Sequence, residues 1–185
     1  MDANLILKNL IAIATILLIC GLYFLTKRWP ISIDTTFSQH AATNRQSYVY
    51  YIVLFVVTLP LLVIFFGHWF VPTFHVSKMF LLLFFTSCVT QILCTLFPEK
   101  GRWRIPHQIL AGVSAILLVL CMSMLSTAIA IPFVFQLIFI VGLICMLTII
   151  VITALQGAKL KRKMIFQIVY YVAFFIPVLA ITYIS

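Results

Sequence analysis

The polar residues best suited to chemistry lie in one short segment, FPEKGRWRIPHQ, residues 97–108, which separates two long apolar runs. Arg102 and Arg104 are permanently charged donors of the kind that bind phosphate or carboxylate groups. His107 lies in what should be the first turn of a helix, where free backbone N–H groups and the helix dipole also attract anions. The segment therefore predicts an anion or lipid-headgroup site. Its members would be Arg102, Arg104, His107 and Gln108.

A second polar segment, ISIDTTFSQHAATNRQS, residues 31–47, lies between the first two apolar runs. His40 and Arg45 from this segment would join the same site if both segments face one side of a membrane. Asp34 or Thr35 is suited to cap a short interfacial helix here, and a solvated loop is the alternative structure.

An enzymatic alternative would use the same two segments. Histidine and carboxylate side chains serve as general bases, as orienting groups or as metal ligands. No H-E-x-x-H or G-x-S-x-G spacing supports a particular reaction. The alternative is thus a membrane-embedded hydrolase or transferase that acts on a lipid headgroup, with no catalytic residue assigned. Its candidate side chains would be Asp34, His40, Glu99 and His107.

Histidine and cysteine spacing favours neither a metal centre nor a cofactor. The four histidines lie near the ends of apolar runs, whereas a b-type haem needs two histidines at similar depth on facing helices. The five cysteines all lie inside apolar runs and include no C-x-x-C pair. His68 and His75 fall in one short predicted turn and could bind a metal on the outer face. We predict no cofactor and no metal.

Composition indicates that most of the chain is surrounded by lipid. Of its 185 residues, 65% are hydrophobic and 8% are charged, against about a quarter charged in soluble proteins. A helix needs about 20 apolar residues to cross a bilayer. The pattern predicts an all-α polytopic membrane protein, a single six-helix bundle over residues 1–185. The predicted spans are residues 9–26, 48–67, 79–97, 105–126, 132–155 and 164–184.

The sequence also predicts where the fourth span turns into the fifth and how the fourth helix packs. The uncharged stretch Ile105–Leu155 is too long for one crossing, so it must turn back, and Ser126–Pro132 is the predicted turn. Pro132 suits the first turn of the following helix. Ala111 and Ala115 form a small-residue patch that predicts close packing of the fourth helix against a neighbour.

The basic residues predict the orientation in the membrane. Ten of the 12 lysines and arginines fall in the first, third and fifth loops, and only Lys8 and Lys78 lie on the other side. By the positive-inside rule these loops are cytoplasmic and both termini are outside. The same loops explain the formal charge of +9, so we expect membrane lipids as partners and no nucleic acid. No span carries a charged residue near its centre, which disfavours an ion-coupled transporter.

The order of these motifs resembles a known group. Phe97 and Pro98, followed by His107 and Ala111 at the start of the fourth span, resemble the DRAM/FRAG/Sfk-like six-helix membrane proteins, especially their bacterial relatives of unknown function. Eukaryotic members are associated with lipid organisation and membrane trafficking. The resemblance implies a lipid-related, non-catalytic membrane role. We also expect a bacterial inner membrane, and other membrane-protein subunits among the candidate partners. The intervening EKGRWR matches no rule of that group.

These observations lead to one favoured function. We predict a non-enzymatic, lipid-interacting or accessory membrane protein with an anion or headgroup site on its basic cytoplasmic face. The predicted site residues are Arg102, Arg104, His107, Gln108, His40 and Arg45.

Overall fold

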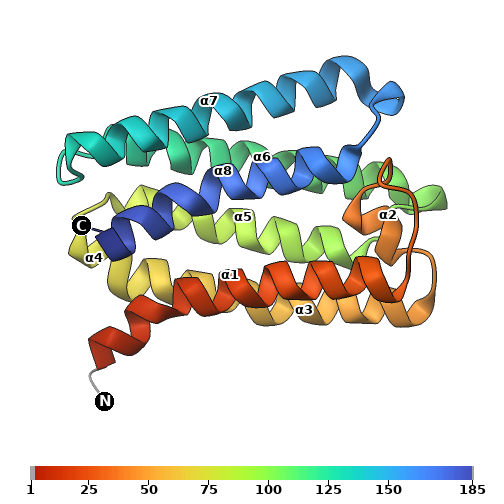
Figure 1. Ribbon diagram of the computed structural model, residues 1–185, viewed down its shortest axis with the longest axis horizontal. Coiled ribbons are helices and arrows are strands. Elements are labelled where there is room, and N and C mark those ends of the chain that lie inside the picture. Colours follow the sequence, from red (N-terminus) through yellow and green to blue (C-terminus); the bar gives the residue numbers. More distant parts are fainter. Residues whose placement is uncertain (1–2, 185) are drawn as a thin grey trace.

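The computed structural model describes residues 3–184, and every regular element in that range is helical (Figure 1). All six of its long helices are long and apolar enough to cross a membrane. The prediction of an all-α, six-span membrane protein is therefore confirmed. The long helices are α1 (Ala3–Arg28), α3 (Arg45–Phe65), α5 (Lys78–Leu96), α6 (Arg104–Ser126), α7 (Phe133–Gln156) and α8 (Lys163–Ile184).

The second span is longer than its sequence suggests. Helix α3 continues through a π-helical turn, η1 (Phe66–Phe70), into α4 (Val71–Thr73), so the apolar helix extends to Thr73. The expected turn over residues 68–78 was therefore too long, and His68 lies within the helix. Within residues 3–184 no group of three or more histidine, cysteine or acidic side chains is placed to hold a metal ion.

A short helix, α2 (Phe37–Ala41), forms in the first loop, as one of the two expected structures. Its cap is Thr36, whose hydroxyl accepts the N–H of Gln39 while the Gln39 side chain accepts the N–H of Thr36. The choice of Asp34 or Thr35 as the cap was wrong because this reciprocal capping box needs the Thr-x-x-Gln spacing. Asp34 Oδ1 instead accepts the N–H of Arg162, 2.7 Å away, before the start of α8.

The turn between the fourth and fifth spans lies where it was expected. Helix α6 ends at Ser126 and α7 begins at Phe133. Pro132 is the residue before α7 and not part of its first turn. Two short 3-10 turns complete the elements, η2 (Gly101–Trp103) before α6 and η3 (Gly157–Lys159) after α7.

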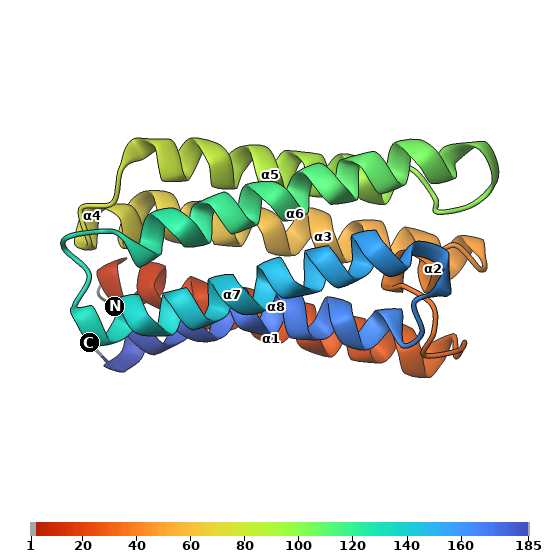
Figure 2. The same cartoon turned by 90° about the horizontal axis from the view of Figure 1, so that it is seen from above.

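Helices that follow one another in the chain lie side by side around the bundle. Helix α8 completes the arrangement where the Tyr183 hydroxyl donates to Asn9 Oδ1 of α1 at 3.0 Å. Helix α7 packs tightly on α8, since a Cβ placed on Gly142 would lie only 2.6 Å from the carbonyl oxygen of Ala173. Helices α6 and α7 meet at their connecting turn and diverge toward the opposite end of the bundle (Figures 1 and 2).

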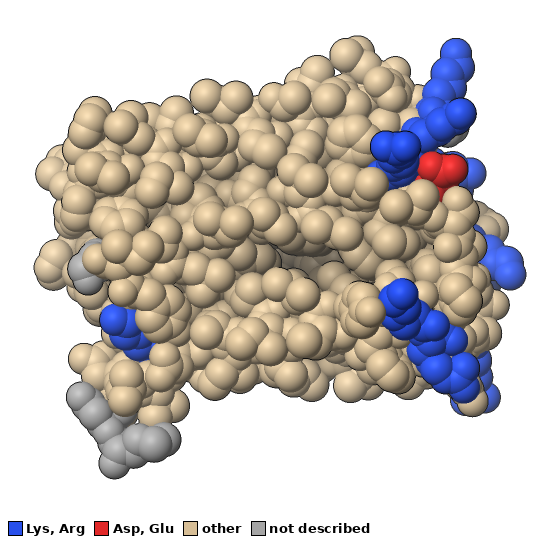
Figure 3. All heavy atoms as spheres, in the orientation of Figure 1, with Lys and Arg blue, Asp and Glu red and all other residues tan. Residues whose placement is uncertain are grey.

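Lysine and arginine side chains gather at the end of the bundle that carries the first, third and fifth loops (Figure 3). We call this the basic end. Helix α1 begins and helix α8 ends at the other end (Figure 1). The structure thus separates the charges as the sequence predicted, and the side of the membrane that each end faces remains a prediction. The basic-end residues are Lys27, Arg28, Arg45, Lys100, Arg102, Arg104, Lys159, Lys161, Arg162 and Lys163.

Candidate functional site

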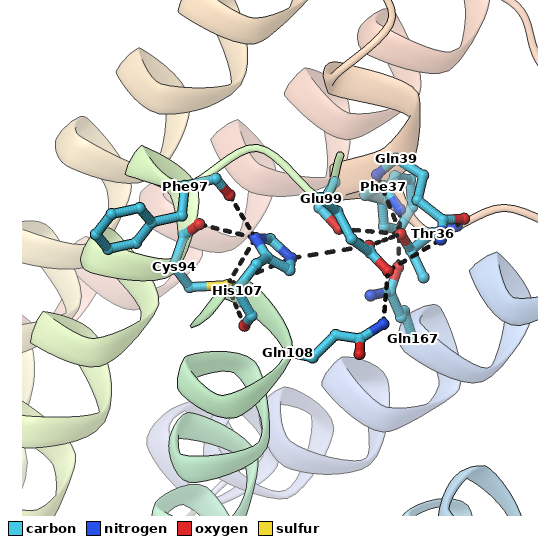
Figure 4. Close-up of polar contacts among 10 residues, drawn as sticks. Thr36, Phe37, Gln39, Cys94, Phe97, Glu99, His107, Gln108 and Gln167 are labelled. Atoms are coloured by element: carbon cyan, nitrogen blue, oxygen red, sulfur yellow. Dashed lines mark hydrogen bonds and ion pairs between the residues drawn. The ribbon is translucent and has the colours of Figure 1, made fainter. Parts of the chain in front are cut away.

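The centre of the basic end is the carboxylate of Glu99, whose side chain is only 6% exposed. Its Oε2 atom accepts hydrogen bonds of 2.6 Å from the hydroxyls of Thr36 and Ser38. Its Oε1 atom accepts one of 2.9 Å from Gln39 Nε2 and a longer one of 3.5 Å from Gln108 Nε2 (Figure 4). Four neutral donors from the first loop and α6 therefore surround one carboxylate.

Local structure explains why these donors converge. The capping box at Thr36 starts α2, and its first turn presents the side chains of Thr36, Ser38 and Gln39 together. The N–H of Phe37 donates to Gln167 Oε1 at 2.9 Å, which ties this turn to α8. Helix α5 ends before Pro98, which has no N–H to continue it, and the chain then turns Glu99 toward α2.

His107 occupies the next position inward, at the start of α6. Its Nδ1 atom lies 2.7 Å from the carbonyl oxygen of Phe97 and 2.9 Å from that of Cys94. Both partners are acceptors, so we assign a proton to Nδ1. The other ring nitrogen, Nε2, lies 3.8 Å from Glu99 Oε2. Nε2 is therefore the ring nitrogen that faces the carboxylate.

The Glu99 carboxylate is negatively charged at neutral pH. Burial raises its pKa, but the hydrogen bonds from Ser38 and Thr36, with smaller contributions from His107 and Gln108, lower the pKa below its ordinary value. No lysine or arginine forms an ion pair with Glu99 within residues 3–184. Neutral donors therefore hold a buried charge without a permanent cation beside it.

A cavity of about 550 Å³ lies beside this cluster, between α6, α7 and α8. The polar part of its lining includes Glu99, His107 and Gln108, together with two cationic side chains, Arg104 and Lys163. The wall that extends into the spans is mainly apolar, past Ile116, Ile150 and Tyr170, with Gln91 and Ser114 among its polar members. The cavity is thus charged at the basic end and mainly apolar within the spans.

Small residues make room for this cavity. Ala111, Gly112 and Ala115 of α6 and Ala154 of α7 line it. A Cβ placed on Gly112 would meet no atom within 4 Å. Ala111 and Ala115, which were expected to pack closely on a neighbouring helix, border this space on the side where α6 and α7 diverge (Figure 2). The adjacent Ser114 does make a close contact, since its hydroxyl donates to the carbonyl oxygen of Ser87 in α5 at 3.1 Å.

The structure brings together three of the six predicted site residues. Arg104, His107 and Gln108 line the cavity, whereas Arg102 is exposed with its Cζ atom 5.1 Å from the centre of the Trp103 ring. Arg45 is exposed in the first turn of α3 and does not line the cavity.

His40 also lies outside the cavity lining, although it is 1% exposed. Neither of its ring nitrogens forms a hydrogen bond of good geometry with a described residue. Burial lowers the pKa of His40, and the backbone of Trp29 partly opposes this effect. His40 is therefore a neutral, buried histidine that packs the first loop.

Sequence reasoning missed the residues that organise the site. Glu99 was considered only for the enzymatic alternative, although it is one of just three acidic residues in the chain. The Thr-x-x-Gln capping box was a further signal for Thr36 and Gln39. The remaining missed residues are Ser38, Lys163 and Gln167.

Cys94 and His107 are in contact but are not arranged as a nucleophile and its base. The Cys94 thiol lies 3.4 Å from His107 Nδ1 and 3.5 Å from Nε2, so it is not aligned with the lone pair of either nitrogen. Nδ1 is already occupied by two carbonyl groups. A nucleophile needs a base directed at its proton, and this cysteine–histidine pair lacks that alignment.

No family model, curated protein or solved structure matches the chain. The function is therefore inferred from the geometry of the site.

Proposed function

We propose that this integral membrane protein binds a single membrane lipid in the cavity at its basic end, without changing the lipid chemically. The observation that carries the proposal is the cavity of about 550 Å³, which joins apolar walls inside the spans to a charged region at the basic end. A lipid has the same division between apolar chains and a polar head. The cavity volume lies within the range of about 300–1,000 Å³ typical of small-molecule sites.

The lipid phosphate lies between Arg104 and Lys163. These two cations come from different loops, the third and the fifth, and both line the same cavity. Hydrogen bonds from cationic side chains to phosphate oxygens are stronger than those between neutral groups. This assignment keeps the predicted anion site at Arg104, with His107 and Gln108 beside it, and adds Lys163.

The acyl chain occupies the apolar part of the cavity between α6 and α7. Gly112 and Ala115 supply space there, and apolar side chains such as Ile116 are exposed beside it. A lipid can thus enter sideways from the membrane without exposing its chain to water. The predicted resemblance to lipid-organising membrane proteins supports the same role, in a bacterial inner membrane.

The basic end faces the cytoplasm in this proposal. Ten of the 12 lysines and arginines lie at this end. The positive-inside rule associates such an excess with the cytoplasmic side. A cysteine at exposed Lys100 should be protected from an impermeant maleimide in intact cells, whereas a cysteine at exposed Ile129 should be labelled. The reverse labelling pattern would contradict the orientation.

Native mass spectrometry of the purified protein tests the lipid site. Wild-type protein should retain one phospholipid, and Arg104→Gln or Lys163→Gln should weaken retention about tenfold or more. Lys159→Gln is the matched control because Lys159 is exposed and lies outside the cavity lining. Absence of retained lipid, or equal small losses in all three variants, would contradict the proposal.

The buried pair of His107 and Glu99, 3.8 Å apart, is the observation that favours the enzymatic alternative. Lipid analysis of reconstituted protein separates the two functions. A headgroup product that increases with time and disappears in His107→Ala would establish an enzyme, whereas an unchanged lipid supports binding alone.

A further inference from the structure

We propose that the bound lipid is zwitterionic, with a primary ammonium that pairs with Glu99 while its phosphate lies between Arg104 and Lys163. This inference rests on the lipid site proposed above and names the chemical class of its headgroup. Both signs of charge line one cavity, the carboxylate from the third loop and the two cations from α6 and the start of α8.

Glu99 has no permanently charged counterion among the described residues. The carboxylate is buried and accepts hydrogen bonds from the hydroxyls of Thr36 and Ser38 and from the amides of Gln39 and Gln108. Its ion-pair partner is the His107 imidazole, whose Nε2 atom lies 3.8 Å from Oε2. A charge in a site of low dielectric constant exerts a strong field on nearby groups because water does not screen it. The cavity therefore attracts a cation to the side that Glu99 lines.

The Glu99 carboxylate can accept one more strong hydrogen bond. Three of its hydrogen bonds are 2.6, 2.6 and 2.9 Å long, but the bond from Gln108 Nε2 is 3.5 Å. Gln108 is an exposed side chain at the cavity edge and can rotate away. An ammonium group can then donate to Oε1 without disturbing the contacts with α2.

A purely anionic headgroup fits the cavity less well. A lipid with phosphate and hydroxyl groups alone would satisfy Arg104 and Lys163 but would place no positive charge beside Glu99 to offset the negative charge of its phosphate. Uncompensated like charges at close range in a cavity disfavour binding. A quaternary ammonium would supply charge but no N–H donor, so a primary amine fits best.

The preference can be measured on the wild-type protein by changing only the lipid. Phosphatidylethanolamine, phosphatidylglycerol and phosphatidylcholine with identical acyl chains compete for purified protein, and native mass spectrometry reports the bound species. We expect phosphatidylethanolamine to bind at least tenfold more tightly than phosphatidylglycerol, with phosphatidylcholine between them. N-acetylated phosphatidylethanolamine, which lacks the positive charge, should lose the advantage.

A matched pair of variants assigns the preference to Glu99. Glu99→Gln should reduce the preference for phosphatidylethanolamine over phosphatidylglycerol to less than threefold. Asp34→Asn should leave it unchanged because Asp34 lies outside the cavity lining and accepts the N–H of Arg162. If Glu99→Gln does not fold, the lipid series on wild-type protein still decides the question.

The outcomes separate this inference from the function on which it rests. No retained lipid of any class would overturn the lipid site itself. Retained lipid without a headgroup preference would leave the lipid site standing and overturn the inference, because Glu99 would then pair with no cation of the lipid. An undiminished preference in Glu99→Gln would overturn it as well.

Discussion

Ser38 donates a 2.6 Å hydrogen bond to Glu99 across 61 residues of chain. This contact joins the first loop to the third at the basic end, and the adjacent bond from Thr36 reaches the same carboxylate oxygen. Because Glu99 also lines the cavity, one side chain both holds α2 in place and faces the proposed ligand. Changes at Glu99 should therefore affect both stability and binding.

Glu99→Gln should destabilise the protein by about 2 kcal/mol or more, because the amide nitrogen cannot accept the hydrogen bonds that one carboxylate oxygen receives from Thr36 and Ser38. Denaturant or thermal unfolding in detergent measures the change. Lys100→Gln is the control, since Lys100 is exposed and adjacent in the same loop, and its effect should stay within about 0.5 kcal/mol. Equal stability of the two variants would contradict the structural role of Glu99.

The same carboxylate should make the protein sensitive to acid. Burial raises the pKa of Glu99, but its hydrogen bonds lower the folded-state pKa below the model-peptide value of 4.5. A folded-state pKa below the unfolded-state value means that folding favours the charged carboxylate. The stabilisation that Glu99 contributes is therefore complete above pH 4.5, and it is lost as the pH falls through the folded-state pKa. Melting temperatures between neutral and acidic pH should fall further for wild type than for Glu99→Gln. Parallel curves would contradict this assignment.

The spans were predictable because a bilayer imposes length and apolarity on each helix, whatever its neighbours are. The extension of the second span to Thr73 was not predictable, because no change in residue polarity marks the π-helical turn at Phe66–Phe70 through which the helix continues. Glu99 was missed for a different reason. Its role depends on contacts with Ser38 and Gln39, about 60 residues away, and no local pattern records them.

The small residues of α6 illustrate the same limit. Small side chains at Ala111 and Ala115 leave space beside the helix. Their spacing does not say whether a neighbouring helix or a cavity occupies that space. In the structure Ser114 of this patch contacts Ser87 of α5, whereas Ala111 and Ala115 border a cavity, and another close approach occurs at Gly142 of α7. Side-chain size alone does not distinguish these two situations.

Gly142→Ala should destabilise the bundle by about 1–3 kcal/mol, the usual cost of overpacking. The new Cβ would lie 2.6 Å from the backbone oxygen of Ala173 and from Met122 Cε, and the backbone oxygen cannot rotate away. Gly112→Ala is the matched control because nothing lies within 4 Å of its Cβ position. Thermal unfolding should separate the two variants, and a Gly142→Ala protein as stable as Gly112→Ala would disprove the close contact of α7 with α8.

Gly112→Leu should fill part of the cavity and displace the bound lipid while leaving the fold intact. The space beside Gly112 is open, so the larger side chain replaces the acyl chain without moving a helix. Val113→Leu is the control, because Val113 is 40% exposed on the outer surface of α6 and lies outside the cavity lining. Native mass spectrometry should find at least tenfold less lipid on Gly112→Leu than on Val113→Leu, at similar melting temperatures. Equal lipid retention would place the lipid outside this cavity, whereas a loss of stability in Gly112→Leu alone would mean that the space beside Gly112 closes in the folded protein.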